Sequence, residues 1–340
     1  MIELAPEARE RIERALGQDL LSVARLAGGA CQDNFVIEAG LPGQVDAPRS
    51  RWVLRSDART SLPGSIDRAR EFEVLQAAVR AGVTTAAPRD LLPDLLAPGA
   101  SAYLLEWVPG EAIGRKIVRG EELSEARKKL PELLVGELAK IHAITPASEP
   151  SLLDAEASGK PGFSPALARV ASMRVSVAKL HSPRPALALL LRWLEENAPP
   201  PDGDICLVHG DFRTGNFMVT REGLSAVLDW EFAHWGSPYE DLTWISVRDW
   251  RFGQLALPIG GIARRAPFYE AYTRATGREL SPALLHYWEV LGNVSWAVGA
   301  ACQSERYTHG GEDDLELLAI GRRAAEMEWE ALRLVMKGAI

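Results

Sequence analysis

The segment LVHGDFRTGNFMV, residues 207–219, places a polar loop between two short apolar runs and constrains the fold more than any other stretch. The apolar runs are too short and too rich in strand-forming residues for helices, so they predict buried strands. A polar loop that leaves a hydrophobic core and re-enters it is typical of a rigidly mounted functional site. The chain is therefore expected to carry its chemistry on this loop.

Composition sets only broad limits on that chemistry. The chain has 340 residues, 47% apolar and 25% charged, a size that allows two sub-domains with cores of their own. A formal net charge of −8 argues against nucleic acid as a main partner. No apolar run is long enough to span a membrane, and the charged first residues do not resemble a signal peptide. Three widely spaced cysteines, Cys31, Cys206 and Cys302, indicate free thiols and a cytoplasmic protein.

The order of expected elements divides the chain near residues 108–110. Strand-like runs and a helix over residues 65–81 precede this break, and mostly helices follow it. We expect an α+β, bilobal fold with a small β-rich lobe over residues 1–107 and a larger helical lobe over 108–340 that holds a small hairpin. The helices expected in the second lobe cover residues 124–144, 186–197, 238–250, 267–276, 282–303 and 312–336.

Three oxygen-bearing side chains mark the loop and the strand that follows it. Asp211 and Asn216 lie five residues apart, and Asp229 follows a second apolar strand. Such ligands suit Mg²⁺, which takes one or two carboxylates and otherwise keeps water or phosphate oxygens. In phosphoryl transfer, one aspartate accepts the proton of the attacking hydroxyl while an asparagine and a second aspartate hold Mg²⁺. The spacing therefore predicts Asp211 as base and Asn216 and Asp229 as metal ligands.

The motif HGDFRTGN, residues 209–216, followed by VLDWE, residues 227–231, resembles that of the aminoglycoside phosphotransferase and choline kinase superfamily. The wider context AVLDWEFAHWGSPYEDLTW is most similar to the kinase-like domains fused to acyl-CoA dehydrogenases. The resemblance implies a protein-kinase-like fold and transfer of the γ-phosphoryl group of ATP, or GTP, to a hydroxyl of a small molecule. Protein kinases carry HRD and DFG where this chain has HGD and DWE, so no protein-kinase-type flipping switch is expected.

The first half supplies a cation and a carboxylate for the nucleotide phosphates. Arg55 sits where the family's strand carries a lysine or arginine, and its guanidinium can fork onto two phosphate oxygens. In the following helix, Glu71 falls within the apolar stripe whereas Glu73 points away from it. A carboxylate on the core-facing side needs a partner, so Glu71 is expected to hold Arg55.

Two further expectations depend on the same resemblance. Gly28 and Gly29 would lie at a hairpin that covers the phosphates, although a plain tight turn is the alternative. The backbone near Glu106 and Val108 would hydrogen-bond the adenine, so their side chains would matter little.

The acceptor is expected beside Asp211 in the helical lobe, where tryptophans are frequent. A dense carboxylate pocket for a cationic aminoglycoside is not evident, which favours a hydroxylated acceptor with an apolar portion, such as an acyl thioester. Tryptophans at helical spacing are more often core than pocket residues. The candidates are Trp235, Tyr239, Trp244, Asp249, Trp250, Trp288 and Trp296.

Several other polar residues have simpler interpretations. His209 is expected to support the loop through backbone hydrogen bonds, and Asp241 to orient it. Arg213 fits a surface ion pair and a phosphate contact equally well. The charged residues of 304–316 are expected to be solvated beside a helix N-terminus.

Two other classes of function remain open. A non-catalytic, nucleotide-binding kinase-like protein would use the same fold, but the intact Asp-Asn-Asp set argues against it. A metal-dependent hydrolase could use His209, Asp211, Asp229 and His234 as metal ligands. This alternative leaves Asn216 and the first lobe unexplained. A tightly retained transition metal would support the hydrolase. The oligomeric state is not indicated.

Overall fold

The computed structural model describes residues 4–26, 33–41, 49–57, 64–158, 160, 162–201 and 203–338. Its first part is a five-stranded antiparallel sheet with strand order β1-β2-β3-β5-β4. β4, which the sequence did not predict, begins and ends with proline, and an edge position tolerates this because its outer side makes no ladder hydrogen bonds. The strands are β1 (Asp19–Arg25), β2 (Asp33–Gly40), β3 (Ser50–Ser56), β4 (Pro88–Pro93) and β5 (Ser101–Glu106).

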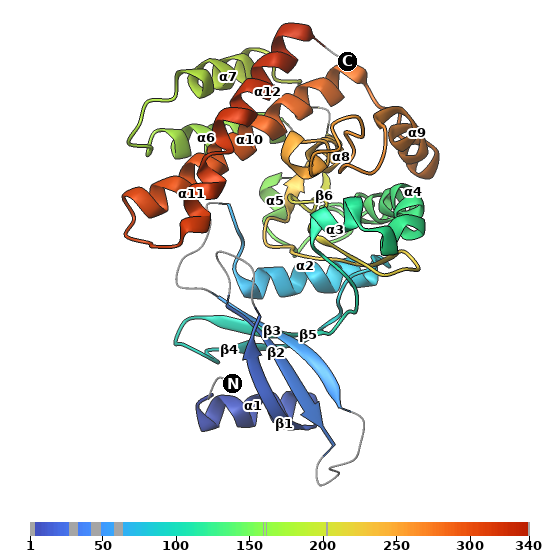
Figure 1. The fold of residues 1–340 in the computed structure, drawn as a ribbon, viewed down its shortest axis with the longest axis vertical. Coiled ribbons are helices and arrows are strands. Elements are labelled where there is room, and N and C mark those ends of the chain that lie inside the picture. The colour runs from blue at the N-terminus through green and yellow to red at the C-terminus, as the bar shows by residue number, and fades with distance from the viewer. Residues whose placement is uncertain are drawn as a thin grey trace.

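Two helices cover the two faces of this sheet, as Figure 1 shows. Helix α1 (Pro6–Leu16) lies on the outer face and α2 (Arg68–Arg80) on the face toward the helical part. Successive side chains of a strand point to opposite faces. Leu104 of β5 accordingly joins the core cluster of α1, whereas Tyr103 packs with α2, its ring 5.9 Å from that of Phe72.

The second part of the chain is mostly helical and lies beyond α2 (Figure 1). Helix α10 (Pro282–Thr308) contacts α6, α7, α8, α11 and α12 and so forms its centre. The other helices are α3 (Gly114–Arg119), α4 (Ser124–Ile141), α5 (Ala155–Ser158), α6 (Pro165–Val177), α7 (Pro185–Glu196), α8 (Pro238–Trp244), α9 (Arg265–Thr276), α11 (Leu315–Gly321) and α12 (Ala324–Lys337), with 3₁₀-helices at Glu121–Leu123 and Arg248–Arg251.

Two short ladders interrupt these helices. β6 (Cys206–Val208) pairs with β9 (His234–Gly236), and β7 (Phe217–Val219) forms a hairpin with β8 (Leu224–Val227). The polar loop therefore runs from one ladder to the other. The largest core cluster extends from α2 and β5 to α4 and the β7–β8 hairpin. The loop is thus mounted where the sheet and the helical part meet.

The expected α+β architecture is confirmed, but some boundaries differ. The helix expected over residues 312–336 is broken into α11 and α12. The break follows Gly321, where α11 packs so closely on α10 that any side chain would overlap that of Ser304. The helix expected over 238–250 ends at Trp244, and a separate 3₁₀-helix follows.

Helix α6 lies in a stretch where no helix was expected. Its start nevertheless carries two recognisable signals, because the hydroxyl of Ser164 accepts the N–H of Leu167 and Pro165 occupies the first helical position.

Within the described ranges, no helix combines the length and the apolar composition needed to cross a membrane. Cys206 and Cys302 are free thiols, and Cys31 lies outside the described residues.

Candidate active site

The loop between β6 and β7 is held by a buried aspartate of α8. The carboxylate of Asp241 accepts the backbone N–H groups of His209 (2.7 Å) and Gly210 (3.0 Å). His142 Nε2 lies 3.3 Å from the same carboxylate. Burial alone would raise the pKa of Asp241, but the hydrogen bonds from His142 and the loop outweigh it and lower this pKa. Asp241 therefore orients the loop, as expected.

His209 supports the loop from inside. Its Nε2–H donates to the carbonyl oxygen of Leu228 (2.9 Å), and its Nδ1 accepts the N–H of Asp211 (3.2 Å). Both ring nitrogens are thus used structurally. In the described part of the chain, His209, Asp211, Asp229 and His234 do not supply three ligand atoms close enough to share one metal ion. This geometry does not favour the metal-dependent hydrolase.

Asp211 is nearly buried and receives hydrogen bonds on both carboxylate oxygens. Nδ2 of Asn216 donates to Oδ2 (2.6 Å), and Nε1 of Trp244 donates to Oδ1 (2.7 Å). Nε of Arg213 lies 3.0 and 3.1 Å from the two oxygens, so this arginine makes an ion pair with Asp211. Burial raises the pKa of Asp211, the charge of Asp229 raises it further, and Arg213 opposes the shift.

Asn216 and Asp229 flank the β7–β8 hairpin on the same side as Asp211. The N–H of Leu228 donates to the carbonyl oxygen of Asn216 (2.8 Å), which closes the hairpin. Asp229 has a left-handed φ of +68°, and its side chain is 30% exposed. Because the amide nitrogen of Asn216 is bound to Asp211, Oδ1 is the atom that it offers to a cation. A carboxylate and an amide oxygen beside a second carboxylate fit Mg²⁺.

Arg55 of β3 reaches the same place from the sheet. Its Nη2 lies 3.0 Å from Oδ1 of Asp229 and 3.3 Å from Oε1 of Glu71. Glu71 is fully buried, whereas Glu73 is exposed, as the helical stripe predicted. Burial disfavours a charged guanidinium, but Glu71 and Asp229 outweigh this effect and raise the pKa of Arg55.

A second arginine, which the sequence analysis missed, extends these ion pairs into a longer series. Arg68 contacts the other oxygen of Glu71, and its Nη2 lies 2.9 Å from Oε2 of Glu231. The five-residue ion-pair series thus runs Asp229, Arg55, Glu71, Arg68, Glu231. Burial and the charge of Asp229 raise the pKa of Glu231 to about 7. The spacing of Arg68 three residues before Glu71, on one helix face, was the signal that could have found it.

Of the residues expected to contact the nucleotide, Glu106 and Val108 are described by the structure, whereas two glycines are not. Gly28 and Gly29 lie outside the described residues. Glu106 ends β5 with an exposed side chain, and its N–H donates to the carbonyl oxygen of Ala87 (3.1 Å), so this N–H is engaged within the protein. Val108 follows and packs against the largest core cluster.

A row of three tryptophans extends from Asp211 across the helical part. Trp244 and Trp250 have ring centroids 5.8 Å apart, and Trp250 and Trp296 are 4.8 Å apart. The guanidinium of Arg213 lies 4.3 Å from the ring centre of Trp250. Trp250 is buried, while Trp244 and Trp296 are half-buried.

The remaining acceptor candidates have more structural surroundings. Trp235 and Trp288 are buried core residues, and Tyr239 is buried with its hydroxyl accepting the N–H of Ser281. Asp249 accepts Nε1 of Trp296 (2.7 Å) and is also paired with an arginine of the α11–α12 turn.

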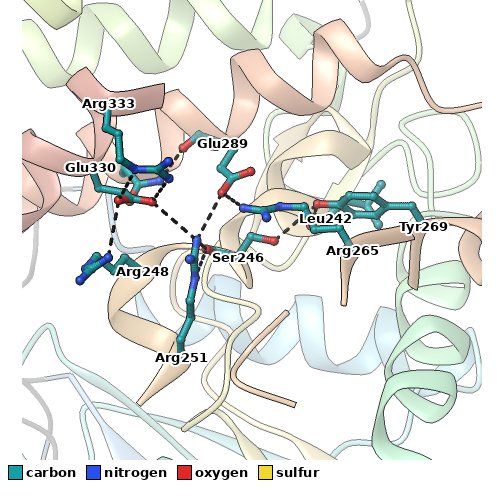
Figure 2. Close-up of polar contacts among 10 residues, drawn as sticks. Leu242, Ser246, Arg248, Arg251, Arg265, Tyr269, Glu289, Glu330 and Arg333 are labelled. Carbon is teal, nitrogen blue, oxygen red and sulfur yellow. Dashed lines mark hydrogen bonds and ion pairs between the residues drawn. The ribbon is translucent and has the colours of Figure 1, made fainter. Parts of the chain in front are cut away.

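The 3₁₀-helix that carries Trp250 is anchored by ion pairs, as Figure 2 shows. Arg251 lies between Glu289 of α10 and Glu330 of α12, at 3.4 and 3.9 Å, and also donates to the carbonyl oxygen of Ser246 (2.7 Å). Arg248 lies 3.7 Å from Glu330. These contacts fix the tryptophan row to the two long helices.

Solved structures of other proteins share this fold. A solved structure from Ralstonia eutropha JMP134, assigned as an aminoglycoside phosphotransferase, superposes with a TM-score of 0.76 at 24% identity and covers 98% of this chain and 99% of its own. The streptomycin–ATP–APH(2″)-IIa ternary complex has a TM-score of 0.56 at 15% identity and covers 96% of this chain and 97% of its own. These similarities show the fold.

The chain is also similar in sequence to curated proteins and to a family model. Acyl-CoA dehydrogenase family member 11 of Gallus gallus is 30% identical over 231 residues, which are 66% of this chain and 27% of that protein. The chain therefore spans about a quarter of the length of the curated relatives it matches. Residues 22–281 match the model of the phosphotransferase enzyme family. The chain belongs to the phosphotransferase enzyme family.

Proposed function

We propose that this chain transfers the γ-phosphoryl group of ATP, or GTP, to a hydroxyl of a small molecule. The observation that carries the proposal is the gathering of Asp211, Asn216 and Asp229 around one point that Arg55 also reaches. In this proposal, residues 1–107 bind the nucleotide and residues 108–340 supply the base and the acceptor site.

Asp211 is proposed as the base that accepts the proton of the attacking hydroxyl. Its raised pKa suits this task, because a carboxylate that binds a proton more readily is a better base at neutral pH. The hydrogen bonds from Asn216 and Trp244 fix the orientation of the carboxylate before the acceptor arrives.

Asn216 and Asp229 are proposed to hold Mg²⁺ through their oxygen atoms, and Arg55 to hold the nucleotide phosphates. When bound, Mg²⁺ would neutralise phosphate charge and orient the transferred group. Glu71 keeps the guanidinium of Arg55 at the inner end of β3, so the phosphates would find a cation already in place.

The acceptor is proposed to be a hydroxylated molecule with an apolar portion that lies along the tryptophan row. Aromatic faces bind apolar groups. Asp249, at the far end of this row from Asp211, is already paired with Trp296 and Arg323, so its carboxylate is engaged within the protein and is not left for a polycationic aminoglycoside. An acyl thioester is one candidate, since curated relatives are named acyl-CoA dehydrogenase family members.

Two measurements on the wild type and Asp211→Asn test the proposal. Melting with Mg²⁺ and ATP, then GTP, should show a nucleotide-dependent rise in both proteins, because ligands of the folded state raise the melting temperature. ADP release with a panel of hydroxylated acceptors should be lost in Asp211→Asn only, by a factor of about 10² to 10⁴. Asp90→Asn, on β4, is the matched control.

Each failure has its own meaning. A melting shift without ADP release from any acceptor would favour a non-catalytic nucleotide-binding protein. Full activity in Asp211→Asn would overturn the proposed base.

A further inference from the structure

A second group of metal-ligating side chains lies at the C-terminal end of α10, outside the candidate active site. Glu305 and His309 are four residues apart on this helix, a spacing that places both on one face. His181 reaches the same face from the segment that follows α6. Part of 304–316, expected to be merely solvated charge, therefore belongs to a three-residue cluster in which His181 and Glu305 lie 124 positions apart in the chain.

The three side chains share one oxygen atom. Oε2 of Glu305 lies 2.6 Å from Nδ1 of His181 and 3.0 Å from Nδ1 of His309. The two imidazoles stack face to face, with centroids 3.7 Å apart and planes 4° from parallel. Among the described residues, these three side chains are the set of His, Cys, Asp or Glu residues whose ligand atoms all lie within 4.8 Å of one another.

The backbone helps to hold the carboxylate in this position. The N–H of His181 donates to the other oxygen of Glu305 (3.2 Å), so Oε2 is left to face both rings. Metal binding requires the ionised form of a carboxylate.

Each Nδ1 faces the shared oxygen and can donate a proton to it. One divalent cation can replace both of these protons. Ligands about 2.1 Å from a tetrahedral ion lie about 3.4 Å apart, so the two stacked rings would have to tilt away from their parallel arrangement for both Nδ1 atoms to point at one ion.

We propose that His181, Glu305 and His309 form a binding site for a divalent transition-metal ion, with Zn²⁺ as the best fit. Two imidazole nitrogens and one carboxylate oxygen are a usual zinc ligand set that leaves a fourth position for water. Mg²⁺ prefers oxygen ligands and is not expected here. The site is therefore chemically distinct from the oxygen ligands of Asp211, Asn216 and Asp229.

The ion would join two segments at the edge of a cavity. Glu305 also lines an open cavity of about 380 Å³ whose wall includes Lys179, Leu180 and Cys302. A metal bound to His181 and Glu305 would fasten the segment after α6 to α10 beside this cavity. Zinc retained by the purified protein would then mark this cluster and would not indicate a hydrolytic centre.

Titration of the full chain with Co²⁺ alone, after chelator treatment, tests the site. Cobalt bound to histidine absorbs visible light, and added Zn²⁺ should displace it at one equivalent. We expect His181→Ala and His309→Ala to weaken Co²⁺ binding by about 10- to 100-fold. The side chains of both histidines are at least 45% exposed, so these substitutions should fold normally, which circular dichroism checks.

Two control variants separate the outcomes. His286→Ala removes a histidine of the same helix whose ring packs against Trp193, and it should bind Co²⁺ like the wild type. Asp229→Asn alters the candidate active site and should also bind it unchanged. The proposal is overturned if no Co²⁺ or Zn²⁺ binds, if the two histidine variants bind like the wild type, or if Asp229→Asn alone abolishes binding.

Discussion

Nη2 of Arg55 lies 3.0 Å from Oδ1 of Asp229, so the arginine proposed to hold the phosphates is paired with a carboxylate proposed to hold the metal ion. The two residues are 174 positions apart in the chain and come from β3 and from the end of the β7–β8 hairpin. Each neutralises the charge of the other. In the proposed function, a nucleotide that takes Arg55 would free Asp229 for a cation, which would couple the two binding events.

Arg55→Gln should weaken ATP binding and strengthen Mg²⁺ binding in the absence of nucleotide. The lost charge-assisted hydrogen bonds correspond to about 1.5 to 3 kcal/mol, or roughly 10- to 100-fold in affinity. Calorimetric titrations with ATP and with Mg²⁺ measure both effects. Arg51→Gln, at an exposed position of the same strand, is the control. Equal ATP affinity in the two variants would contradict the role of Arg55.

Arg213→Gln should move the acid limb of the pH profile of kcat/KM to higher pH. A base must be ionised to act, and activity rises as pH rises through the pKa of Asp211, which burial already raises. The cation of Arg213 opposes that rise, so its removal raises the pKa further. Rates measured from pH 4 to 9 check the direction. A limb that stays in place, or moves to lower pH, would argue against Asp211 as the titrating base.

Glu231→Gln should change how stability depends on pH. The pKa of Glu231 is about 7 in the folded protein, above the usual 4.5. Between these values the folded state keeps a proton that the unfolded chain releases, so the free energy of unfolding falls as pH rises from 4.5 to 7. The variant lacks this contribution, which amounts to about 3 kcal/mol over that range.

Urea unfolding of wild type and variant at pH 5, 6, 7 and 8 measures the difference. Glu73→Gln, on the exposed side of α2, should follow the wild-type curve. Parallel curves for Glu231→Gln and the wild type would show that this carboxyl keeps its ordinary pKa.

Gly210→Ala should damage the protein more than Gly82→Ala, although the two glycines have nearly the same φ, +79° and +77°. At Gly82 no atom lies within 4 Å of a new Cβ, so only the left-handed backbone is disfavoured, by about 1 to 2 kcal/mol. At Gly210 the Cβ would overlap the carbonyl oxygen of Phe232 and push the loop away from Asp241. Urea unfolding measures the costs, and equal costs would show that the loop can move freely.

Much of the fold could be predicted from local patterns. The strand runs, the α2 stripe and the start of α10 at Ser281–Pro282 each carry a signal within a few residues, and the structure has these elements. The break at Gly321 could not be predicted in this way. It depends on close packing against Ser304, and no local pattern records contacts between distant segments.

In the candidate site too, some features have a local sequence signal and others depend on contacts between distant residues. Asp211, Asn216 and Asp229 stand out because their spacing is set by one loop and one hairpin, and the structure brings them together. The pairing of Arg68 with Glu231 crosses 163 positions, so no spacing rule indicates it. The hydrogen bond from Trp244 to Asp211 was equally hidden, since tryptophan usually signals a core position.

The five-residue ion-pair series has a carboxylate at each end, and this has an electrostatic consequence. Positive and negative groups alternate along it, so three carboxylates share two guanidiniums. The carboxylates at its ends, Asp229 and Glu231, are two positions apart in the sequence, and the charge of Asp229 raises the pKa of Glu231. The series is thus one positive charge short, and the deficit falls beside the residue proposed to hold the metal ion.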